Sequence, residues 1–270
     1  MDLTTLALAF TVLDWPERQK AELWAAFQAG ADPALPTSQT KALERLAKEL
    51  PQRRQEALDR GARLLLPGDP GVDALLAPLP YPIALWVRGS LPPEGPRLAM
   101  VGSRQASVPG KARARAWARF FTKAGVAVLS GLARGIDGAA HEGALEVGAT
   151  WGLLGSGLDH PYPPEHRPLM DRMVAAGGGI ITPFPPEAPP LKWHFPRRNW
   201  LLAAWTEGVL VLEARLRSGS LVTAKLALDL GKELFVVPGS EGPDALLEEG
   251  AAYAVERPEA LLDLLREPPG

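Results

Sequence analysis

Short apolar runs alternate with segments of helical length over most of this chain, and no other feature constrains the fold as strongly. The runs are rich in valine, isoleucine and leucine, as strands buried on both faces are. Repeated strand–helix units form a parallel, doubly wound sheet with right-handed crossovers. We expect strands at residues 97–101, 126–129, 150–154, 179–182, 208–214 and 233–237, and helices at 110–123, 138–147, 166–176, 199–205 and 220–230.

The first part of the chain has helical rather than strand-like periodicity. Leu43, Leu46 and Leu50 recur at helical spacing, which gives that segment one apolar stripe to bury. We therefore expect a small all-α N-terminal domain over residues 1–66, followed by a linker rich in proline and glycine at 67–80 and an α/β domain at 81–270. The expected N-terminal helices cover residues 4–13, 17–29, 41–50 and 52–66.

Composition excludes several classes of protein. The chain has 270 residues, 46% of them apolar, and no cysteine, so it has no disulfide framework, no thiolate nucleophile and no cysteine-based metal site. Its first residues do not resemble a signal peptide, and no apolar run approaches the length of a membrane helix. We expect a cytoplasmic protein without membrane contact.

The net charge of -2 hides an uneven distribution of charged residues. Residues 97–136 contain many arginines and lysines and no aspartate or glutamate, whereas acidic residues dominate after Pro238. One surface of the molecule could therefore be basic and bind a polyanion. The alternative, that these cations are scattered over solvated helix faces, remains open.

Loops of small residues follow nearly every expected strand. In a parallel sheet these loops gather at the carboxyl edge, where ligands bind beside a topological switch point. Glycines there let backbone N–H groups and helix N-termini approach an anion. The stretch SGLARGID, residues 130–137, is one of several such loops, and a row of phosphates suits them better than a single phosphate.

Catalytic motifs are missing. The nearest match to a dinucleotide fingerprint, at Gly155 and Gly157, lacks the third glycine, and neither a P-loop nor a nucleophile elbow occurs. His160 and His166 lack further ligands at zinc-site spacing. Asp137 and His141 share a helix face and could form a general base; alternatively, Asp137 is an N-cap and His141 holds the loop in shape. We expect no metal and no cofactor.

The segment 183–205 is expected to be a long, proline-stiffened loop at the same edge. It carries Lys192, Trp193, Phe195, Arg197 and Arg198, the mixture of cations and aromatic faces found in binders of single-stranded nucleic acid. The alternative is a lid that packs Trp193 and Phe195 on its own core. Asn199 is the only asparagine of the chain, so a specific structural role is expected for it.

Taken together, the motifs VGSRQAS, SGLARGIDGAAHEGAL, GSGLDHPYPPE, FPRRN, EARLRSGSLVTAKLAL and ELFVVPGS closely resemble the DNA-processing protein A (DprA) family, also called Smf. The resemblance spans about residues 81–250. It implies an extended Rossmann-like fold that binds single-stranded DNA without sequence preference, dimerises, and loads the recombinase RecA onto incoming DNA during natural transformation. It implies no catalysis and no cofactor.

Carried over by motif, the resemblance also implies a set of DNA-binding residues. These are Gly102, Ser103, Arg104, Ser130, Gly131, Arg134, Lys192, Phe195, Arg197, Arg198, Asn199, Ser218, Gly219 and Ser220. Trp200 stands where the family usually has a further basic residue, so stacking could replace charge there. We expect the N-terminal helices to be sterile-alpha-motif-like in number and position, and the family's C-terminal winged helix to be absent.

Two rival functions remain. One is a nucleotide-processing enzyme of the lysine decarboxylase-like family, although that family's Gly-Thr loop is missing from the stretch PGSEGPDALLEEG. The other is a sensor that binds a free nucleotide without DNA, which only a binding measurement separates from the leading hypothesis.

Overall fold

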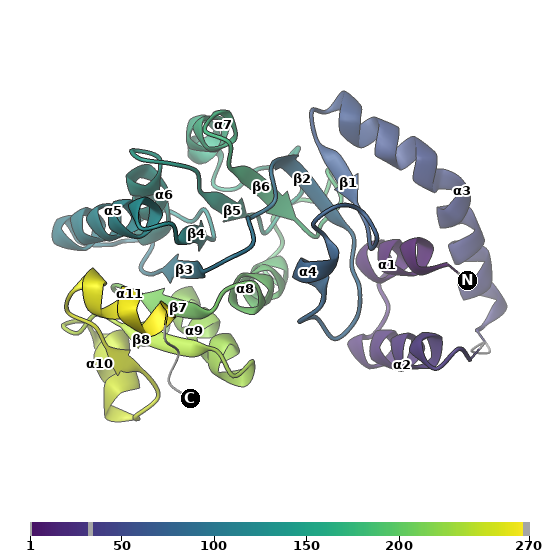
Figure 1. Ribbon diagram of the computed structural model, residues 1–270. Helices are drawn as coiled ribbons and strands as arrows, with labels where there is room; N and C mark the ends of the chain where they lie inside the picture. Colours follow the sequence, from purple (N-terminus) through teal and green to yellow (C-terminus); the bar gives the residue numbers. More distant parts are fainter. Residues whose placement is uncertain (1, 32–34, 267–270) are drawn as a thin grey trace.

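The computed structural model describes residues 2–31 and 35–266, and a sheet of nine strands lies at its centre (Figure 1). The strand order is β1-β2-β6-β5-β4-β3-β7-β8-β9. The strands are β1 (Arg63–Leu65), β2 (Leu85–Gly89), β3 (Arg97–Val101), β4 (Ala127–Ser130), β5 (Trp151–Leu153), β6 (Gly179–Thr182), β7 (Gly208–Val211), β8 (Glu233–Val236) and β9 (Tyr253–Ala254).

The strands from β3 to β9 are parallel, and the chain winds outward from β3 in two directions. It runs from β3 through β4 and β5 to β6, and then returns to pair β7 with the other edge of β3. The switch point therefore lies between β3 and β7, beyond their carboxyl ends. The predicted fold class, an α/β protein of extended Rossmann-like type with a doubly wound, mostly parallel sheet and N-terminal helices, is confirmed.

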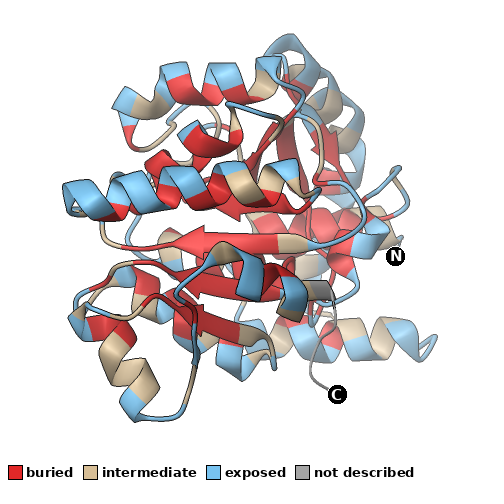
Figure 2. Cartoon of the chain, turned by 60° about the vertical axis from the view of Figure 1, so that its left-hand side comes forward, coloured by how far each residue is buried: buried red, intermediate tan, exposed pale blue. Residues whose placement is uncertain are grey.

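Helices cover both faces of the sheet, and alternate strand residues point to each face. Leu98 and Met100 of β3 belong to one apolar cluster with residues of α5, α6 and α11, whereas Ala99 and Val101 belong to another with residues of α1, α4, α8 and α9. In Figure 2 most of the strand residues are buried, whereas several helices, α5 among them, are buried only on their inner sides. The helices are α1 (Leu3–Val12), α2 (Glu17–Gln28), α3 (Thr37–Asp59), α4 (Asp73–Leu76), α5 (Val108–Lys123), α6 (Ile136–Ala144), α7 (Arg167–Ala175), α8 (His194–Ala204), α9 (Gly219–Asp229), α10 (Glu241–Glu248) and α11 (Pro258–Arg266).

The end of the N-terminal helical region differs from the sequence prediction. Residues 52–66 were expected to be helical, but α3 ends at Asp59 and Gly61 adopts a left-handed conformation with φ of 67°, which glycine tolerates without strain. Residues 63–65 then form β1, which pairs with β2 in antiparallel fashion. The helical prediction for the last residues of that segment is therefore wrong.

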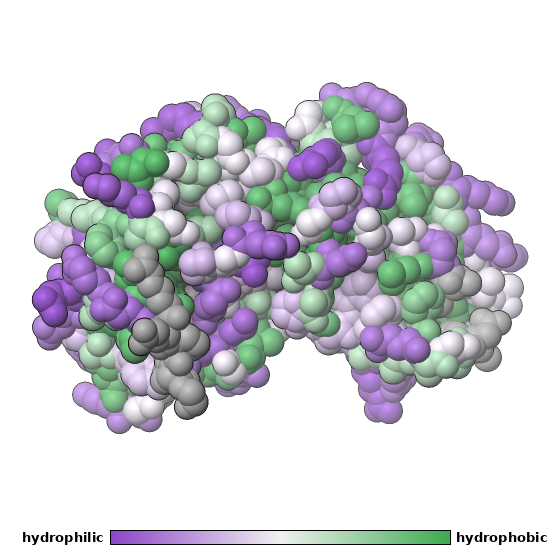
Figure 3. Space-filling model, viewed as in Figure 1, coloured by the Kyte–Doolittle hydropathy of each residue, from purple (hydrophilic) through white to green (hydrophobic). Residues whose placement is uncertain are grey.

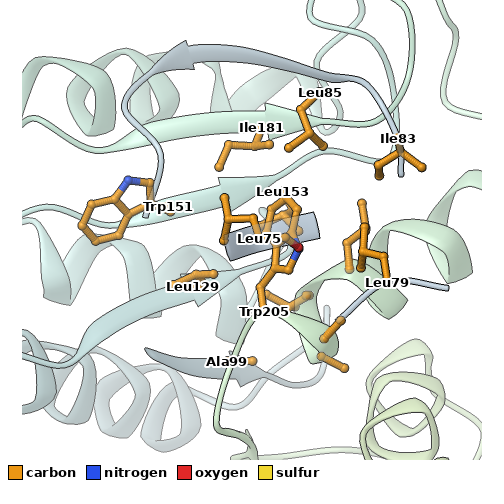
Figure 4. Close-up of a cluster of buried hydrophobic side chains, with 14 of the residues drawn as sticks. Leu75, Leu79, Ile83, Leu85, Ala99, Leu129, Trp151, Leu153, Ile181 and Trp205 are labelled. Atoms are coloured by element: carbon orange, nitrogen blue, oxygen red, sulfur yellow. The ribbon is translucent and has the colours of Figure 1, made fainter. Parts of the chain in front are cut away.

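The expected linker contains a short helix that belongs to the core. Leu75 of α4 lies beside Leu79, Trp205 and Leu153 in the main apolar cluster (Figure 4), and the Trp205 indole N–H donates to the Leu75 carbonyl at 2.8 Å. Helix α1 also packs here through Leu6 and Phe10. The domain boundaries drawn from the sequence stay a prediction.

The surface mixes hydrophilic and hydrophobic residues on the face shown in Figure 3. Among the helices that the structure describes, none combines the length and the apolar character that crossing a membrane requires.

Candidate nucleic-acid interface

A small basic hollow opens beyond the carboxyl ends of β3, β4 and β5. We call it the basic hollow, and its volume is about 20 Å³, which is close to the minimum for one water molecule. It therefore has no room for a nucleoside. Its lining residues are Arg104 after β3, Gly131, Ala133 and Arg134 after β4, Tyr162 and Pro163 after β5, and Phe195 and Arg198 of α8.

Phe195 stands at the centre of the basic hollow, between two arginines and a tyrosine. The guanidinium of Arg104 lies 5.6 Å from the ring centroid, and that of Arg198 lies 5.9 Å away, distances at which a cation is attracted to an aromatic face. Tyr162 meets the same ring edge-on at 5.8 Å. The ring also packs on Gly155, where an added Cβ would lie 2.7 Å from it.

Arg198 is buried and forms part of the floor of the basic hollow. Its guanidinium donates to the carbonyl of Gly131, to the carbonyl of Leu153 at 2.5 Å and to Asn199 Oδ1 at 2.8 Å. Burial lowers the pKa of Arg198 to about 10, and the nearby Asp137 opposes this shift. The side chain therefore remains a cation at neutral pH, but most of its donors serve the protein.

The glycine loop before α6 is braced by its own carboxylate. Asp137 accepts from the backbone N–H groups of Gly131 at 3.1 Å and of Ala133 at 3.3 Å. Burial raises the pKa of Asp137, while Arg198 and these N–H groups oppose the rise. Asp137 does not cap α6 as expected, because the N-cap position belongs to Gly135. It holds the loop in shape, and two loop donors are no longer available to a phosphate.

His141 lies beneath this loop and has no access to solvent. Thr150 Oγ1 donates to the Val128 carbonyl, so the 2.8 Å contact between His141 Nδ1 and Thr150 Oγ1 requires Nδ1–H as the donor. Burial lowers the pKa of His141 to about 3. A substrate cannot reach this imidazole, so the general-base alternative for Asp137 and His141 is wrong.

The cations most open to solvent at the basic hollow are Arg104 and Arg134. Arg104 is exposed, whereas Arg134 pairs with Glu165 through side chains that are both about half-exposed, an arrangement that contributes little in water. Other arginines of the acid-free stretch are neutralised from outside it, since Arg115 and Arg119 of α5 both pair with Glu146. Lys111, Arg113 and Lys123 of the same stretch are exposed on α5, away from the basic hollow. The positive charge of the stretch is therefore divided between the basic hollow and the surface of that helix.

The switch point between β3 and β7 is occupied by a carboxylate of the protein itself. Glu213 accepts from the Ser107 N–H at 2.9 Å and from the Ser107 hydroxyl at 2.6 Å at the start of α5. Its carbonyl accepts from the Ser103 N–H at 2.6 Å. In a dinucleotide fold the pyrophosphate would lie at this helix start, so the protein fills that anion site with its own side chain.

The predicted segment 183–205 is not a continuous loop, because α8 begins within it at His194. Pro196 falls in the first helical turn, where a missing N–H is tolerated. Phe195 and Arg198, three residues apart, reach the basic hollow, whereas Arg197 turns to the other side of α8 and donates to the Phe10 carbonyl at 3.3 Å. Lys192 is exposed ahead of the helix.

The remaining predicted residues lie outside the lining of the basic hollow. Ser130 is buried and donates to the Met100 carbonyl at 2.6 Å, and Gly102 is too close to Ile136 and Glu213 to carry a side chain. Asn199 donates to the Gly219 carbonyl at 3.4 Å and so joins α8 to α9, whose start holds Ser218 and Ser220 in mutual contact. These residues support the edge, and direct DNA contact by them stays a prediction.

Sequence reasoning missed the roles of Tyr162, Ala133 and Glu213. Tyr162 carried a usable signal, because it is an aromatic residue in a proline-rich stretch directly after an expected strand. Glu213 gave none, since its partner Ser107 lies more than a hundred residues away and only the pairing of β3 with β7 brings them together.

Fold and site together define a class: a doubly wound α/β protein with an arginine-lined, aromatic hollow at its carboxyl edge. A sequence model of the family described as DNA recombination-mediator protein A matches residues 69–266. Protein Smf from Escherichia coli is 44% identical over 200 residues, which is 71% of this chain and 53% of the relative. The DNA processing protein DprA from Bacillus subtilis is 37% identical over 63% of this chain and 60% of its own length.

Solved structures agree with these relatives. The X-ray structure of DNA processing protein A from Streptococcus pneumoniae superimposes with a TM-score of 0.76 at 28% identity, covering 99% of both chains. The protein from Helicobacter pylori, studied for its single-stranded DNA binding mode, superimposes with a TM-score of 0.67 at 29% identity, over 76% of this chain and 96% of that one. The chain therefore belongs to the DNA recombination-mediator protein A (DprA) family. It spans between half and two thirds of the two curated relatives described above.

Proposed function

We propose that this protein binds single-stranded DNA at the basic hollow and passes it to a recombinase. The observation that carries the proposal is the arrangement of Arg104, Arg134 and Arg198 around the ring of Phe195. Cations of this kind attract backbone phosphates, and an aromatic face stacks on any base. The site therefore suits a strand whose sequence is not read.

The geometry favours a strand over a free nucleotide. The basic hollow is too small for a nucleoside, and Glu213 fills the helix start at which a pyrophosphate would bind. A strand needs neither feature, because its phosphates can approach the rim one at a time while a base stacks on the accessible part of the Phe195 ring. This argument disfavours both the nucleotide sensor and the nucleotide-processing enzyme.

The role in recombination rests on the family. The description of its members as recombination mediators supports a protein that protects incoming single strands and loads RecA onto them during natural transformation. A cytoplasmic location and the absence of catalysis are parts of the same proposal. Purified protein should leave ATP, nucleoside monophosphates and DNA intact; hydrolysis of any of them, retained through purification and lost in Arg104→Ala, would refute this part.

A homodimer is also part of the proposal. Helix α9 exposes Val222 and Leu228, and Tyr253 of the edge strand β9 is about half-exposed. The expectation of paired subunits comes from the resemblance to the family, and a partner would cover these side chains. Light scattering should give twice the chain mass at tens of micromolar, whereas a monomer at that concentration would contradict this assignment.

A competition experiment tests the binding proposal. Fluorescent oligo-dT should bind and be displaced by unlabelled oligo-dA and oligo-dT alike, since phosphate and stacking contacts carry little sequence information. AMP, NAD and ADP-ribose at millimolar concentration should displace none of it. Tight binding of one of these nucleotides without binding of oligo-dT would replace the proposal with the sensor function.

A further inference from the structure

A second cavity, which we call the aromatic groove, lies on the opposite side of α8 from the basic hollow. Its volume is about 450 Å³, and Tyr81, Trp193, Arg197, Trp200 and Leu201 line it together with Glu17 of α2. Residues 193, 197, 200 and 201 recur at helical spacing and so share one face of α8. Phe195 and Arg198 point from the other face into the basic hollow.

The aromatic groove has the size and lining of a site for flat apolar groups. Pockets of roughly 300–1,000 Å³ with aromatic walls and a few polar groups hold ligands as large as a nucleoside. Trp193 is 58% exposed, although it is one of the largest apolar side chains of the chain. Its contacts with Phe184 and His194 leave more than half of its surface open.

Charge in the aromatic groove favours bases over phosphates. The Glu17 carboxylate accepts from the Tyr81 hydroxyl and from Lys20 Nζ, so it is satisfied within the protein but would repel an entering phosphate. Arg197 makes one hydrogen bond, to Phe10, among the described residues, and a guanidinium has five donors. A base could stack on the indoles while its phosphate remains near Arg197 at the rim.

The two cavities lie on opposite sides of α8, and a strand that joins them would pass the start of this helix. A helix is about 10–12 Å wide with its side chains, and exposed Lys192 precedes Trp193 at the end that a strand would have to pass. We propose that the aromatic groove is a second subsite for the same strand, in which Trp193 and Trp200 stack on bases while the basic hollow holds phosphates. This inference rests on the proposed binding of single-stranded DNA.

Paired oligonucleotides test the subsite. One is a 20-nucleotide dT strand, and the other has the same length and charge but consists of abasic sites. The double variant Trp193→Ala/Trp200→Ala should lose roughly 5- to 150-fold in affinity for dT, the loss expected for one base stack. It should bind the abasic strand as the unaltered protein does, and its salt dependence should not change.

Controls separate this inference from the proposed function. Trp193→Phe/Trp200→Phe should recover most of the affinity, which excludes unfolding as the cause. Leu58→Ala removes an exposed apolar side chain from α3, outside both cavities, and should have no effect. If the double alanine variant binds dT normally while Arg104→Ala binds weakly, the groove inference is wrong and the basic hollow stands. If both variants bind dT normally, the proposed function itself fails.

Discussion

The switch point and the basic hollow lie at the same edge of the sheet, yet they differ in the charge that they present. In both places a carboxylate of the protein occupies backbone donors: Glu213 at the start of α5 and Asp137 in the loop before α6. Only the basic hollow adds arginines above those donors. Under the proposed function, long cationic side chains rather than backbone groups would hold the phosphates.

This arrangement suits a polymer better than a small ligand. Backbone donors at a helix start hold one phosphate group in a fixed position, whereas flexible arginines can follow successive phosphates of a strand. The predictions below test whether the two regions differ in this way.

The largest expected effect comes from the floor of the basic hollow. Arg198→Ala leaves the Gly131 and Leu153 carbonyls without their donor and Asp137 without its buried cation. Removing one partner of a buried, hydrogen-bonded ion pair costs about 3–5 kcal/mol. Urea unfolding of the variant should show a loss of this size in the free energy of unfolding. Exposed Arg104→Ala is the control and should change stability by less than about 0.5 kcal/mol.

The opposite result would show that Arg198 belongs to the DNA-binding surface and not to the supporting floor of the basic hollow. If Arg198→Ala unfolds at the same urea concentration as the unaltered protein but binds oligo-dT poorly, this arginine contacts phosphate directly and is not a support.

His141 beneath the loop should make stability depend on pH. Burial lowers its pKa in the folded protein to about 3 from an ordinary value of 6.5. Between these two pH values His141 binds a proton in the unfolded chain but not in the folded protein. The stabilisation is complete above pH 6.5 and falls by about 1.4 kcal/mol per pH unit toward pH 3. His141→Gln should remove this part of the slope between pH 6 and pH 4; an unchanged slope would show that other groups cause it.

Removing the carboxylate at the switch point tests the other region. Glu213→Ala deprives Ser107 of its acceptor and should cost about 1 kcal/mol of stability, as the loss of a helix cap does. Oligo-dT affinity should stay within about twofold. A clear gain in affinity would mean that the start of α5 becomes a phosphate site once it is uncovered, and that phosphates pass close to it.

The smallest effect concerns the rim of the basic hollow. Glu165→Gln releases Arg134 from its partner and should tighten oligo-dT binding by about two- to fivefold, an effect that salt suppresses. Glu94→Gln changes the net charge equally at an exposed site elsewhere. Equal gains in the two variants would reflect net charge alone and would remove Arg134 from the interface.

Local sequence patterns predicted the six strands from β3 to β8, because nearly all of their residues are buried, but they missed β1, β2 and β9. The apolar runs at residues 97–101 and 179–182 coincide with β3 and β6. The short antiparallel strand β1 could not be distinguished from the end of a helix, because its pairing with β2 is a tertiary contact. The start of α8 at His194 was placed too late, at residue 199, because the many prolines before it are typical of a loop.

The candidate site was predictable in composition but not in burial. The structure brings Arg104, Gly131, Arg134 and Phe195 together, as loops at one sheet edge should be. A motif cannot show that Arg198 points inward and Arg197 away, because that choice depends on which side of α8 faces the sheet. Nor does it show that Asp137 and Glu213 occupy the backbone donors.

The salt dependence of oligo-dT binding tests the central claim most directly. For the unaltered protein, Arg104→Ala and Phe195→Ala, affinity is measured over a series of salt concentrations. Arg104→Ala should weaken binding and flatten the slope of log K against log salt by about 0.7, the value for one phosphate of a single strand. Phe195→Ala should cost about 1–3 kcal/mol with the slope unchanged, and Phe195→Trp should recover most of it. An unchanged slope in Arg104→Ala, or normal binding by a less stable Phe195→Ala, would contradict the account.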